Sequence, residues 1–377
     1  MIENKTILIP FTLPWDWSAD YQRQTCLELA KTNKVIAYFP YKAVFFSKLI
    51  TPFGIKHKNI KVEIPKYYFP FRRIPLIEKI NQSISLLILK KKLPKNTILW
   101  IFDPIFHSYP LQLKSKISLS LYDCVDYHNS LNKKEHFLIR DQEKKLLENS
   151  DLVFINSTTL QKVHCRHHPR LVPQGFDENT FIKPAKKRFK LLSNKPLIGF
   201  IGGINYRLDF NLIQTLVKNN PQWNFAFVGP IQHDSPNHKD NLENKIKNLS
   251  KYQNFILKKG VERKYIPSLI KKFDVAIIPY DINHQFNKYC YPMKLFEYFY
   301  IGKPVVATPI KELQLNKFKK IISISNTSKG WEDHINQLLS KPWPNKLQQR
   351  QRQLAVENSW SNKIRVIGNN IRQMNYS

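Results

Sequence analysis

A short segment near the end of the chain places a lysine and a glutamate one helical turn apart. It reads YPMKLFEYFYIGKPVVAT and spans Tyr291–Thr308. Pro292 suits the first turn of a helix, where its missing N–H costs nothing, and Gly302 and Pro304 suit the helix end. The segment therefore predicts a helix of about ten residues that is followed at once by a strand.

The start of this predicted helix can bind phosphate. Its unpaired N–H groups and its dipole attract anions, and Lys294 adds a full positive charge in the first turn. Glu297 shares a face with Lys294, and its carboxylate can accept hydrogen bonds from ribose hydroxyls, as in dinucleotide-binding folds. From the spacing alone, the alternative is an ordinary amphipathic helix with a Lys294–Glu297 surface pair.

A second set of candidate groups lies in the first half of the chain. Asp126 and His128 come just after a predicted strand at 117–122, and His107 follows the strand WIF. Polar groups at the carboxyl ends of parallel strands are typical of ligand sites in α/β folds. We expect Asp126 and His128 to be catalytic candidates, and the alternative is that all three residues are ordinary loop positions.

Metal-ligating side chains crowd together in the segment HCRHH at 164–168. A metal site is conceivable there, but the segment ends a predicted helix, where cationic side chains are favourable. The chain has four cysteines, and none of them has C-x-x-C spacing. We therefore expect no metal and no cofactor, and the cysteine pattern favours a reducing cytoplasm.

Short apolar runs alternate with helical patterns along the chain, which predicts parallel β-α-β units. In the first half the expected strands are 5–10, 34–39, 97–102, 117–122 and 152–156, with helices at 21–31 and 136–149. The pattern then restarts, with strands expected at 197–201, 223–228, 255–257, 275–279, 305–308 and 321–325 and a helix from 209. The chain is thus an α/β protein with two doubly wound domains.

The domain boundaries follow from this restart. We expect an N-terminal Rossmann-like domain at 1–175, a linker rich in lysine and proline at 176–195, a C-terminal Rossmann-like domain at 196–345 and a helical segment at 346–377. In such folds ligands bind outside the carboxyl ends of the strands. The ligand site is therefore expected between the two domains.

The charge of the chain is strongly positive. Lysine and arginine number 60 and aspartate and glutamate 28, which gives +32. Such a balance suggests nucleic acid, an anionic membrane or a phosphorylated ligand as partner, whereas the plain alternative is a lysine-rich composition. Residues 31–95 hold 15 basic and 2 acidic residues interleaved with ten aromatic ones, and the rest of residues 1–175 is neutral. A basic aromatic window of this kind can contact an anionic bilayer, stack single-stranded nucleic acid, or be a solvated lysine face.

The longest apolar runs, such as Ile84–Leu89, are far shorter than the ~18–20 residues that span a bilayer. No signal peptide is visible at the N-terminus. We therefore expect a cytoplasmic protein, with peripheral attachment to the inner face of the membrane as the form that contact with lipid would take.

The segment Tyr291–Thr308 resembles the donor-site signature of the family 4 glycosyltransferases, which have the two-domain GT-B fold. Further blocks in the same order resemble that family: YDCVDYHN, SDLVFINST, LVPQGFD, GFIGGINYRLDFNLI, FAFVGP, FDVAIIPY and NSWSNKI. Each block is weak alone, but together they cover most of the chain. The resemblance implies two Rossmann-like domains facing a central cleft and a C-terminal helix that returns toward the N-terminal domain.

The resemblance also implies a nucleoside-diphosphate sugar as donor. Glu297 then holds the ribose, Lys294 and Arg207 face the diphosphate, and Gly202-Gly203 lets the backbone approach it closely. The leaving diphosphate can itself accept the proton of the acceptor in a retaining transfer, so neither a dedicated base nor a metal is needed.

Two features depart from the family pattern. Many members carry a first glutamate eight positions before the second, where this chain has Tyr289, and Phe11–Trp17 replaces the usual glycine-rich turn after the first strand. These departures leave the donor sugar undetermined. The expected function is transfer of a sugar to a glycan or glycolipid acceptor in cell-surface polysaccharide biosynthesis. The alternatives are a nucleic-acid-binding protein, disfavoured because no nucleic-acid motif appears, and a GT-B sugar-nucleotide epimerase.

Overall fold

The computed structural model describes residues 2–12, 15, 21–39, 57–65, 68–69, 71, 74–128, 130, 132–185, 194–233 and 239–374. Contacts divide the chain into two compact units, one formed by Met1–Pro173 with Trp360–Ser377 and the other by Gln174–Ser359. Among the described residues, no helix combines the length and the apolar composition needed to cross a membrane.

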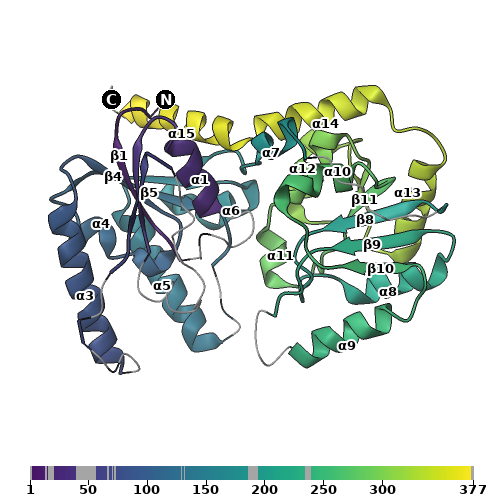
Figure 1. The fold of residues 1–377 in the computed structure, drawn as a ribbon, viewed down its shortest axis with the longest axis horizontal. Helices are drawn as coiled ribbons and strands as arrows, with labels where there is room; N and C mark the ends of the chain where they lie inside the picture. The colour runs from purple at the N-terminus through teal and green to yellow at the C-terminus, as the bar shows by residue number, and fades with distance from the viewer. Residues whose placement is uncertain are drawn as a thin grey trace. The chain divides into compact units, whose positions relative to one another are not determined.

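The first unit is built on a seven-stranded sheet in the order β3-β2-β1-β4-β5-β6-β7 (Figure 1). Every strand pair in it is parallel. The strands are β1 (Thr6–Pro10), β2 (Lys34–Tyr38), β3 (Ile60–Glu63), β4 (Thr97–Ile101), β5 (Ile117–Cys124), β6 (Leu152–Ile155) and β7 (Arg170–Leu171). The strand order reverses between β1 and β4, which is where doubly wound folds bind ligands.

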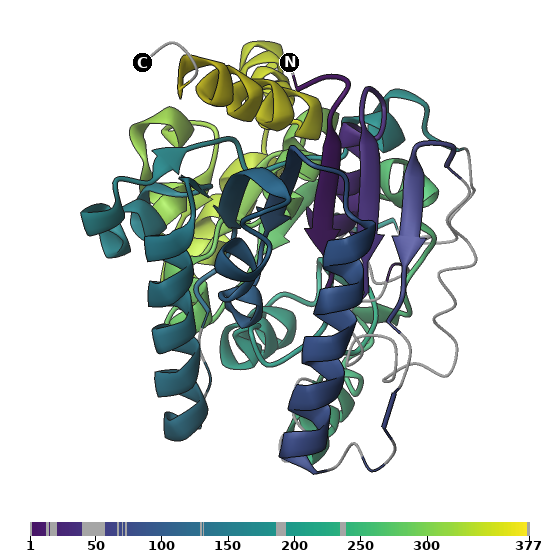
Figure 2. The same ribbon diagram turned by 90° about the vertical axis from the view of Figure 1, so that its left-hand side faces the viewer.

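Helices cover this sheet and supply the rest of the apolar core. They are α1 (Tyr21–Leu29), α3 (Pro75–Lys92), α4 (Tyr109–Gln112), α5 (Lys133–Asn149) and α6 (Thr158–Val163), with short 3₁₀ turns at Pro104–Phe106 and Cys165–His167. Ile7, Leu8 and Ile9 of β1 are fully buried, because a central parallel strand is covered on both faces and needs a continuous apolar run. Figure 2 shows the long α3 and α5 of this unit from the side.

The last helix of the chain, α15 (Trp360–Met374), belongs to the first unit. It packs against α1 (Figure 2), and Ile364 and Ile367 join the same apolar core as β1. The Nζ of Lys363 donates a hydrogen bond to Oδ1 of Asp123 on β5 at 2.9 Å, and both side chains are completely buried. The expected return of the C-terminal helix to the N-terminal domain is confirmed.

The second unit repeats the plan with a six-stranded parallel sheet in the order β10-β9-β8-β11-β12-β13. The strands are β8 (Leu197–Ile201), β9 (Asn224–Val228), β10 (Phe255–Lys258), β11 (Val275–Ile278), β12 (Val305–Ala307) and β13 (Ser323–Ile324). The order again reverses, here between β8 and β11. The doubly wound α/β class predicted from the sequence is therefore confirmed for both units, and every predicted strand is present with ends within about two residues.

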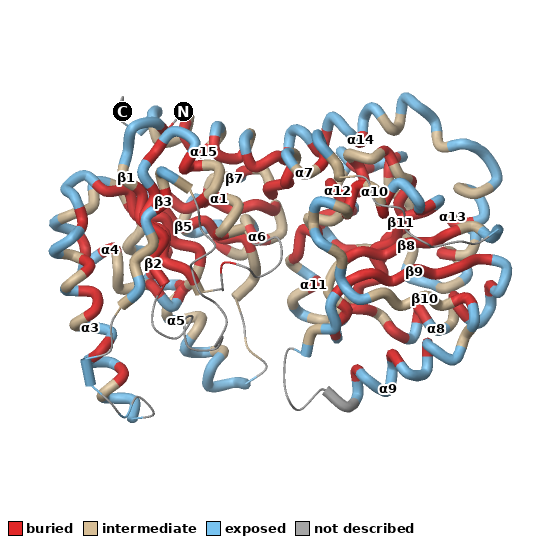
Figure 3. The backbone as a smooth tube through the Cα atoms, in the orientation of Figure 1, coloured by how far each residue is buried: buried red, intermediate tan, exposed pale blue. Residues whose placement is uncertain are grey.

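The helices of the second unit form two packed groups, α8 with α9 and α13, and α12 with α10 and α14. Figure 1 shows α8 and α9 below the strands and α10 and α12 above them. The helices are α7 (Glu178–Ile182), α8 (Phe210–Asn219), α9 (Lys239–Leu249), α10 (Ile266–Ile270), α11 (Gln285–Tyr289), α12 (Lys294–Ile301), α13 (Ser328–Leu339) and α14 (Asn345–Glu357). In both units the buried residues concentrate in the strands (Figure 3).

The predicted linker is more structured than its composition suggests, and the predicted C-terminal segment is helical as expected. Residues 176–195 include α7, with Phe176 and Phe181 in the core of the second unit, while 186–193 lie outside the described residues. The helical segment 346–377 is two helices, α14 in the second unit and α15 in the first. The boundaries proposed from the sequence remain predictions that limited proteolysis can test.

Candidate donor site and a buried cluster on the first unit

The N-terminus of α12 forms the centre of the candidate donor site. The helix runs from Lys294 to Ile301 and ends where Gly302 takes the left-handed conformation, with φ of 78°. The expectation that Pro292 lies in the first turn is wrong, because the helix begins two residues later. The carbonyls of Pro292 and Met293 instead accept hydrogen bonds from the N–H groups of Leu295 and Phe296, three residues on, at 3.1 and 3.0 Å.

Lys294 is held among aromatic rings beside the end of β8. Its Nζ lies 3.9 Å from the centre of the Phe200 ring and 4.7 Å from that of Tyr280. Burial lowers the pKa of Lys294 well below its ordinary value, the nearby Arg207 lowers it further, and Glu297 offsets part of the shift. The charged form of Lys294 is therefore poorly compensated by the chain, and a bound anion would stabilise it.

Gly202 must be a glycine at this place. Its φ is 140°, and a Cβ on it would lie 2.7 Å from the Nζ of Lys294. At the adjacent Gly203 a Cβ would overlap the side chain of Gln232. The Gly202-Gly203 pair thus keeps the backbone after β8 bare next to Lys294, as the sequence predicts for close approach of a phosphate.

Arg207 is held in place close to Lys294. Its guanidinium lies 4.0 Å from the centre of the Phe286 ring and 4.9 Å from that of Tyr280, so Arg207 and Lys294 contact the same tyrosine. The Nε of Arg207 donates to Oδ1 of Asn287 at 3.0 Å, and the amide of Asn287 donates back to the carbonyl of Arg207 at 2.9 Å. The structure therefore brings together the two basic residues that the family resemblance assigns to the diphosphate.

Glu297 is buried, with 8 % of its surface exposed. Its Oε1 accepts a hydrogen bond from Nη1 of Arg263 at 2.9 Å, and Nε of Arg263 donates to Oδ2 of Asp177 at 2.9 Å. The alternative of a Lys294–Glu297 surface pair is wrong, because the carboxylate pairs with Arg263 and faces inward. The sequence reasoning missed Arg263, which no motif marks. Asp177 lies within the quoted block LVPQGFD but was given no role.

Asp126 and His128 follow β5 in the first unit, as predicted, and both are half-buried. The backbone carbonyl of Asp126 accepts a weak hydrogen bond from the thiol of Cys124 at 3.5 Å. Nε2 of His128 is buried and has no hydrogen-bond partner among the described residues. His107 lies elsewhere, after a 3₁₀ turn, where its Nδ1 is 3.2 Å from the carbonyl of Pro104.

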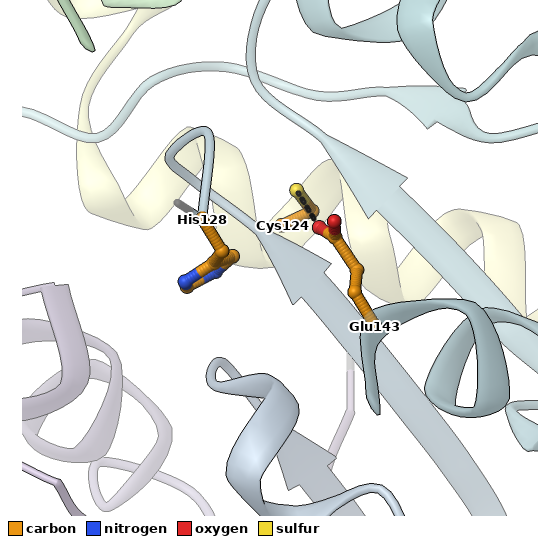
Figure 4. Close-up of side chains that lie close together, drawn as sticks. All are labelled: Cys124, His128 and Glu143. Carbon is orange, nitrogen blue, oxygen red and sulfur yellow. Dashed lines mark hydrogen bonds between the residues drawn. The ribbon is translucent and has the colours of Figure 1, made fainter. Parts of the chain in front are cut away.

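A buried cluster of polar side chains around Glu143 of α5 lies next to His128. Ligand atoms of Cys124, His128 and Glu143 all lie within 4.8 Å of one another (Figure 4). Oε1 of Glu143 accepts from the hydroxyl of Tyr122 at 2.9 Å and from the Cys124 thiol at 3.8 Å. The sequence reasoning missed Glu143, because it reads as one of many charged positions on a helix.

This cluster is compensated by the chain itself. Arg140 pairs with Oε2 of Glu143, and Nε2 of His164 lies 3.5 Å from Oε1. Burial lowers the pKa of His164, and Arg140 adds to the shift while Glu143 opposes it. An arginine already neutralises the carboxylate, so the donor set is a poor fit for a divalent cation. Within HCRHH, His164 is buried whereas Cys165 is exposed, so the segment does not converge on one point.

Comparisons of the sequence with known proteins find similarity to glycosyltransferases. Residues 182–357 match the family model described as Glycosyl transferases group 1. The putative teichuronic acid biosynthesis glycosyltransferase TuaH from Bacillus subtilis (strain 168) is 27% identical over 277 residues, which is 68% of this chain and 67% of that protein.

Solved structures share the fold over nearly the whole chain. Sucrose-phosphate synthase from Thermosynechococcus elongatus superposes with a TM-score of 0.76 at 16% identity, covering 98% of this chain and 99% of its own. A glycosyltransferase from Rickettsia africae gives 0.72 at 15%, covering 99% of each chain. HepE from Anabaena, solved with UDP-glucose, gives 0.70 at 13%, covering 98% of this chain and 99% of its own. At these identities the likeness concerns the fold alone.

Proposed function

We propose that this chain, whose residues 182–357 match the group 1 glycosyltransferase model and which has the GT-B fold, transfers a sugar from a nucleoside-diphosphate sugar to a glycan or glycolipid acceptor. One observation carries the proposal. Lys294, Arg207 and the bare Gly202-Gly203 backbone lie together at the N-terminus of α12, and Glu297 lies one turn further along. Two cations, the positive end of the α12 dipole and a nearby carboxylate suit a diphosphate joined to a ribose.

The donor chemistry follows from these groups. The diphosphate contacts Lys294, Arg207 and the backbone at Gly202, and the ribose hydroxyls donate to Glu297. HepE, which has the same fold, was solved with UDP-glucose, and this supports a nucleotide sugar as the donor without identifying the base here. Tyr289 takes the place of the first glutamate of the family pattern, so the contacts to the sugar hydroxyls differ from those of many members.

We infer a retaining transfer. The bond between C1 of the sugar and the diphosphate oxygen breaks, the acceptor oxygen bonds to C1 on the same face, and the acceptor proton passes to the leaving diphosphate. Lys294, Arg207 and the start of α12 stabilise the charge that develops on the diphosphate. Asp126 and His128 are proposed to bind and orient the acceptor from the first unit.

The acceptor class rests on a relative. TuaH is described as a putative teichuronic acid biosynthesis enzyme, which supports a role for this chain in cell-surface polysaccharide biosynthesis. The match to the glycosyltransferase family model favours this role over the nucleic-acid alternative. A sugar-nucleotide epimerase would act on the same donor. Transfer of the sugar to an added acceptor therefore distinguishes a glycosyltransferase from an epimerase.

We expect nucleoside diphosphates to raise the unfolding temperature of the protein, and we expect EDTA to leave that shift unchanged. Binding to the native state stabilises it by RT ln(1 + [L]/Kd), which is about 2.7 kcal/mol at a ligand concentration of 100 Kd. The cations named above replace a metal at the diphosphate. Differential scanning fluorimetry with UDP, GDP and ADP, with and without EDTA, checks this. If no nucleotide shifts the transition, the donor proposal is wrong; a shift lost in EDTA and restored by Mg²⁺ would contradict metal independence.

We also propose that the first unit contacts anionic membrane through α3. The exposed apolar side chains Leu76, Ile80 and Leu87 follow i, i+4, i+11 spacing and therefore share one face of this helix. Lys79, Lys90 and Lys91 lie close to that face, whereas Lys92 is paired with Glu63 at 3.0 Å. A basic amphipathic face of this kind suits the surface of an anionic bilayer. Five aromatics of the basic window, Tyr41, Phe45, Phe46, Phe53 and Tyr67, lie outside the described residues.

Replacing Lys90 and Lys91 by glutamine is expected to weaken liposome binding about thirtyfold, since each cation near an anionic surface contributes about 1 kcal/mol. Co-sedimentation with vesicles of phosphatidylglycerol and phosphatidylcholine at low and high salt measures this. The matched control replaces Lys247 and Lys251, which are exposed in the second unit, and is expected to bind as the wild type does. Absence of wild-type binding to anionic vesicles at low salt would refute the membrane proposal.

A further inference from the structure

Arg263 joins two carboxylates that come from distant parts of the second unit. It opens the 3₁₀ turn Arg263–Tyr265, shortly after β10. Its Nε bonds to Asp177, which caps α7, and its Nη1 bonds to Glu297 in the first turn of α12, each at 2.9 Å. The two carboxylates are nearly buried, while the side chain of Arg263 keeps 30% of its surface exposed.

The bridge engages only one of the two carboxylate oxygens of Glu297. Arg263 occupies Oε1, and among the described residues no partner is present for Oε2. A glutamate has three rotatable side-chain bonds, so an unpaired carboxylate at this position would sample several orientations. The fork geometry of a guanidinium fixes a carboxylate better than a lysine ammonium can. Burial opposes the charge of Arg263, but Glu297 and Asp177 outweigh it and raise the pKa of the guanidinium, so the bridge stays charged.

We propose that Arg263, anchored by Asp177, is a positioning residue that aims the free oxygen of Glu297 at the ribose hydroxyls and so sets the preference for ribose over deoxyribose. This inference rests on the proposed donor site, but it assigns a role to residues that the donor signature does not include. Arg263 acts through Glu297. Its loss is therefore expected to reduce recognition of the ribose hydroxyls more than recognition of the diphosphate.

The test compares the dissociation constants of UDP and GDP with those of their 2′-deoxy and 3′-deoxy forms. A hydrogen bond to a charged group corresponds to a tenfold or larger preference for the ribose form in the wild type. We expect Glu297→Ala to abolish this preference and Arg263→Met to reduce it to about threefold or less. Arg263→Lys keeps the charge but cannot reach both carboxylates, so we expect only partial rescue.

The matched control is Lys264→Met, which removes one positive charge at the adjacent exposed position and is expected to keep the wild-type preference. Asp177→Asn retains an oxygen that can cap α7 but weakens the contacts of Oδ2 with Arg263 and with the hydroxyl of Thr180, so it provides an intermediate variant if Arg263→Met does not fold. If the wild type binds no nucleoside diphosphate, the proposed function fails. If the wild type prefers ribose and Arg263→Met or Asp177→Asn keeps the full preference, only the present inference fails.

Discussion

Replacing Lys294 by methionine is expected to lower kcat for sugar transfer by about 10²–10³-fold, the cost of removing one group that stabilises charge in a transition state. Methionine fills similar volume between the rings of Phe200 and Tyr280, so the fold should be retained. The ammonium is the cation closest to the bare backbone at Gly202. Its loss therefore acts on the leaving diphosphate rather than on the architecture of α12.

The same variant is also expected to change how nucleotide binding depends on pH. Burial and the proximity of Arg207 lower the pKa of Lys294 in the unliganded protein, whereas a bound diphosphate favours the charged form. Nucleotide binding is therefore expected to take up a proton, and affinity is expected to fall as pH rises through the pKa of unliganded Lys294. Isothermal titration calorimetry in buffers of different ionisation enthalpy measures this uptake.

The control for both effects is Lys218→Met, an exposed lysine in the last turn of α8, which is expected to leave kcat and proton uptake unchanged. Equal proton uptake by the wild type and Lys294→Met would show that the proton binds elsewhere, for example on the nucleotide. A kcat within threefold of the wild type in a folded Lys294→Met protein would remove Lys294 from the leaving-group site.

The fold could be predicted from the sequence because its strands carry strong local signals. Ile7–Ile9 and Val275–Ile278 are continuous apolar runs, and such runs are typical of parallel strands covered on both faces. The strands β3 and β7 were missed for the opposite reason. They lie at the two edges of the first sheet, β7 has only two residues, and IKVE in β3 alternates with charge.

The candidate site could be predicted only where a local motif marks it. Lys294, Glu297 and Gly202-Gly203 lie in segments whose turn chemistry and helix ends are readable from neighbouring residues. Arg263 could not be found this way, because its partners are 34 and 86 positions away in the sequence. A basic residue in a chain of 60 lysines and arginines carries no mark of burial or pairing, and only the fold supplies that information.

The buried pair between Lys363 and Asp123 is the second place where a large effect is expected. It fastens α15, at the end of the chain, to β5, the strand that leads into Asp126 and His128. Oδ2 of Asp123 has no hydrogen-bond partner among the described residues, so the charge of the aspartate is compensated by Lys363. Removing one partner of a buried pair leaves an uncompensated charge in the interior, which costs about 3–5 kcal/mol.

Lys363→Met is therefore expected to lower the free energy of unfolding of the first unit by about 3–5 kcal/mol and to increase amide hydrogen exchange along α15. Adding Asp123→Leu removes the stranded charge, so the double variant is expected to recover much of the loss. Arg365→Met, an exposed change on the same helix, is expected to stay within about 0.5 kcal/mol of the wild type. Urea unfolding and hydrogen exchange measured by mass spectrometry compare the four proteins. A double variant that is less stable than Lys363→Met would contradict the charge argument, because apolar packing rather than an unpaired aspartate would then explain the loss.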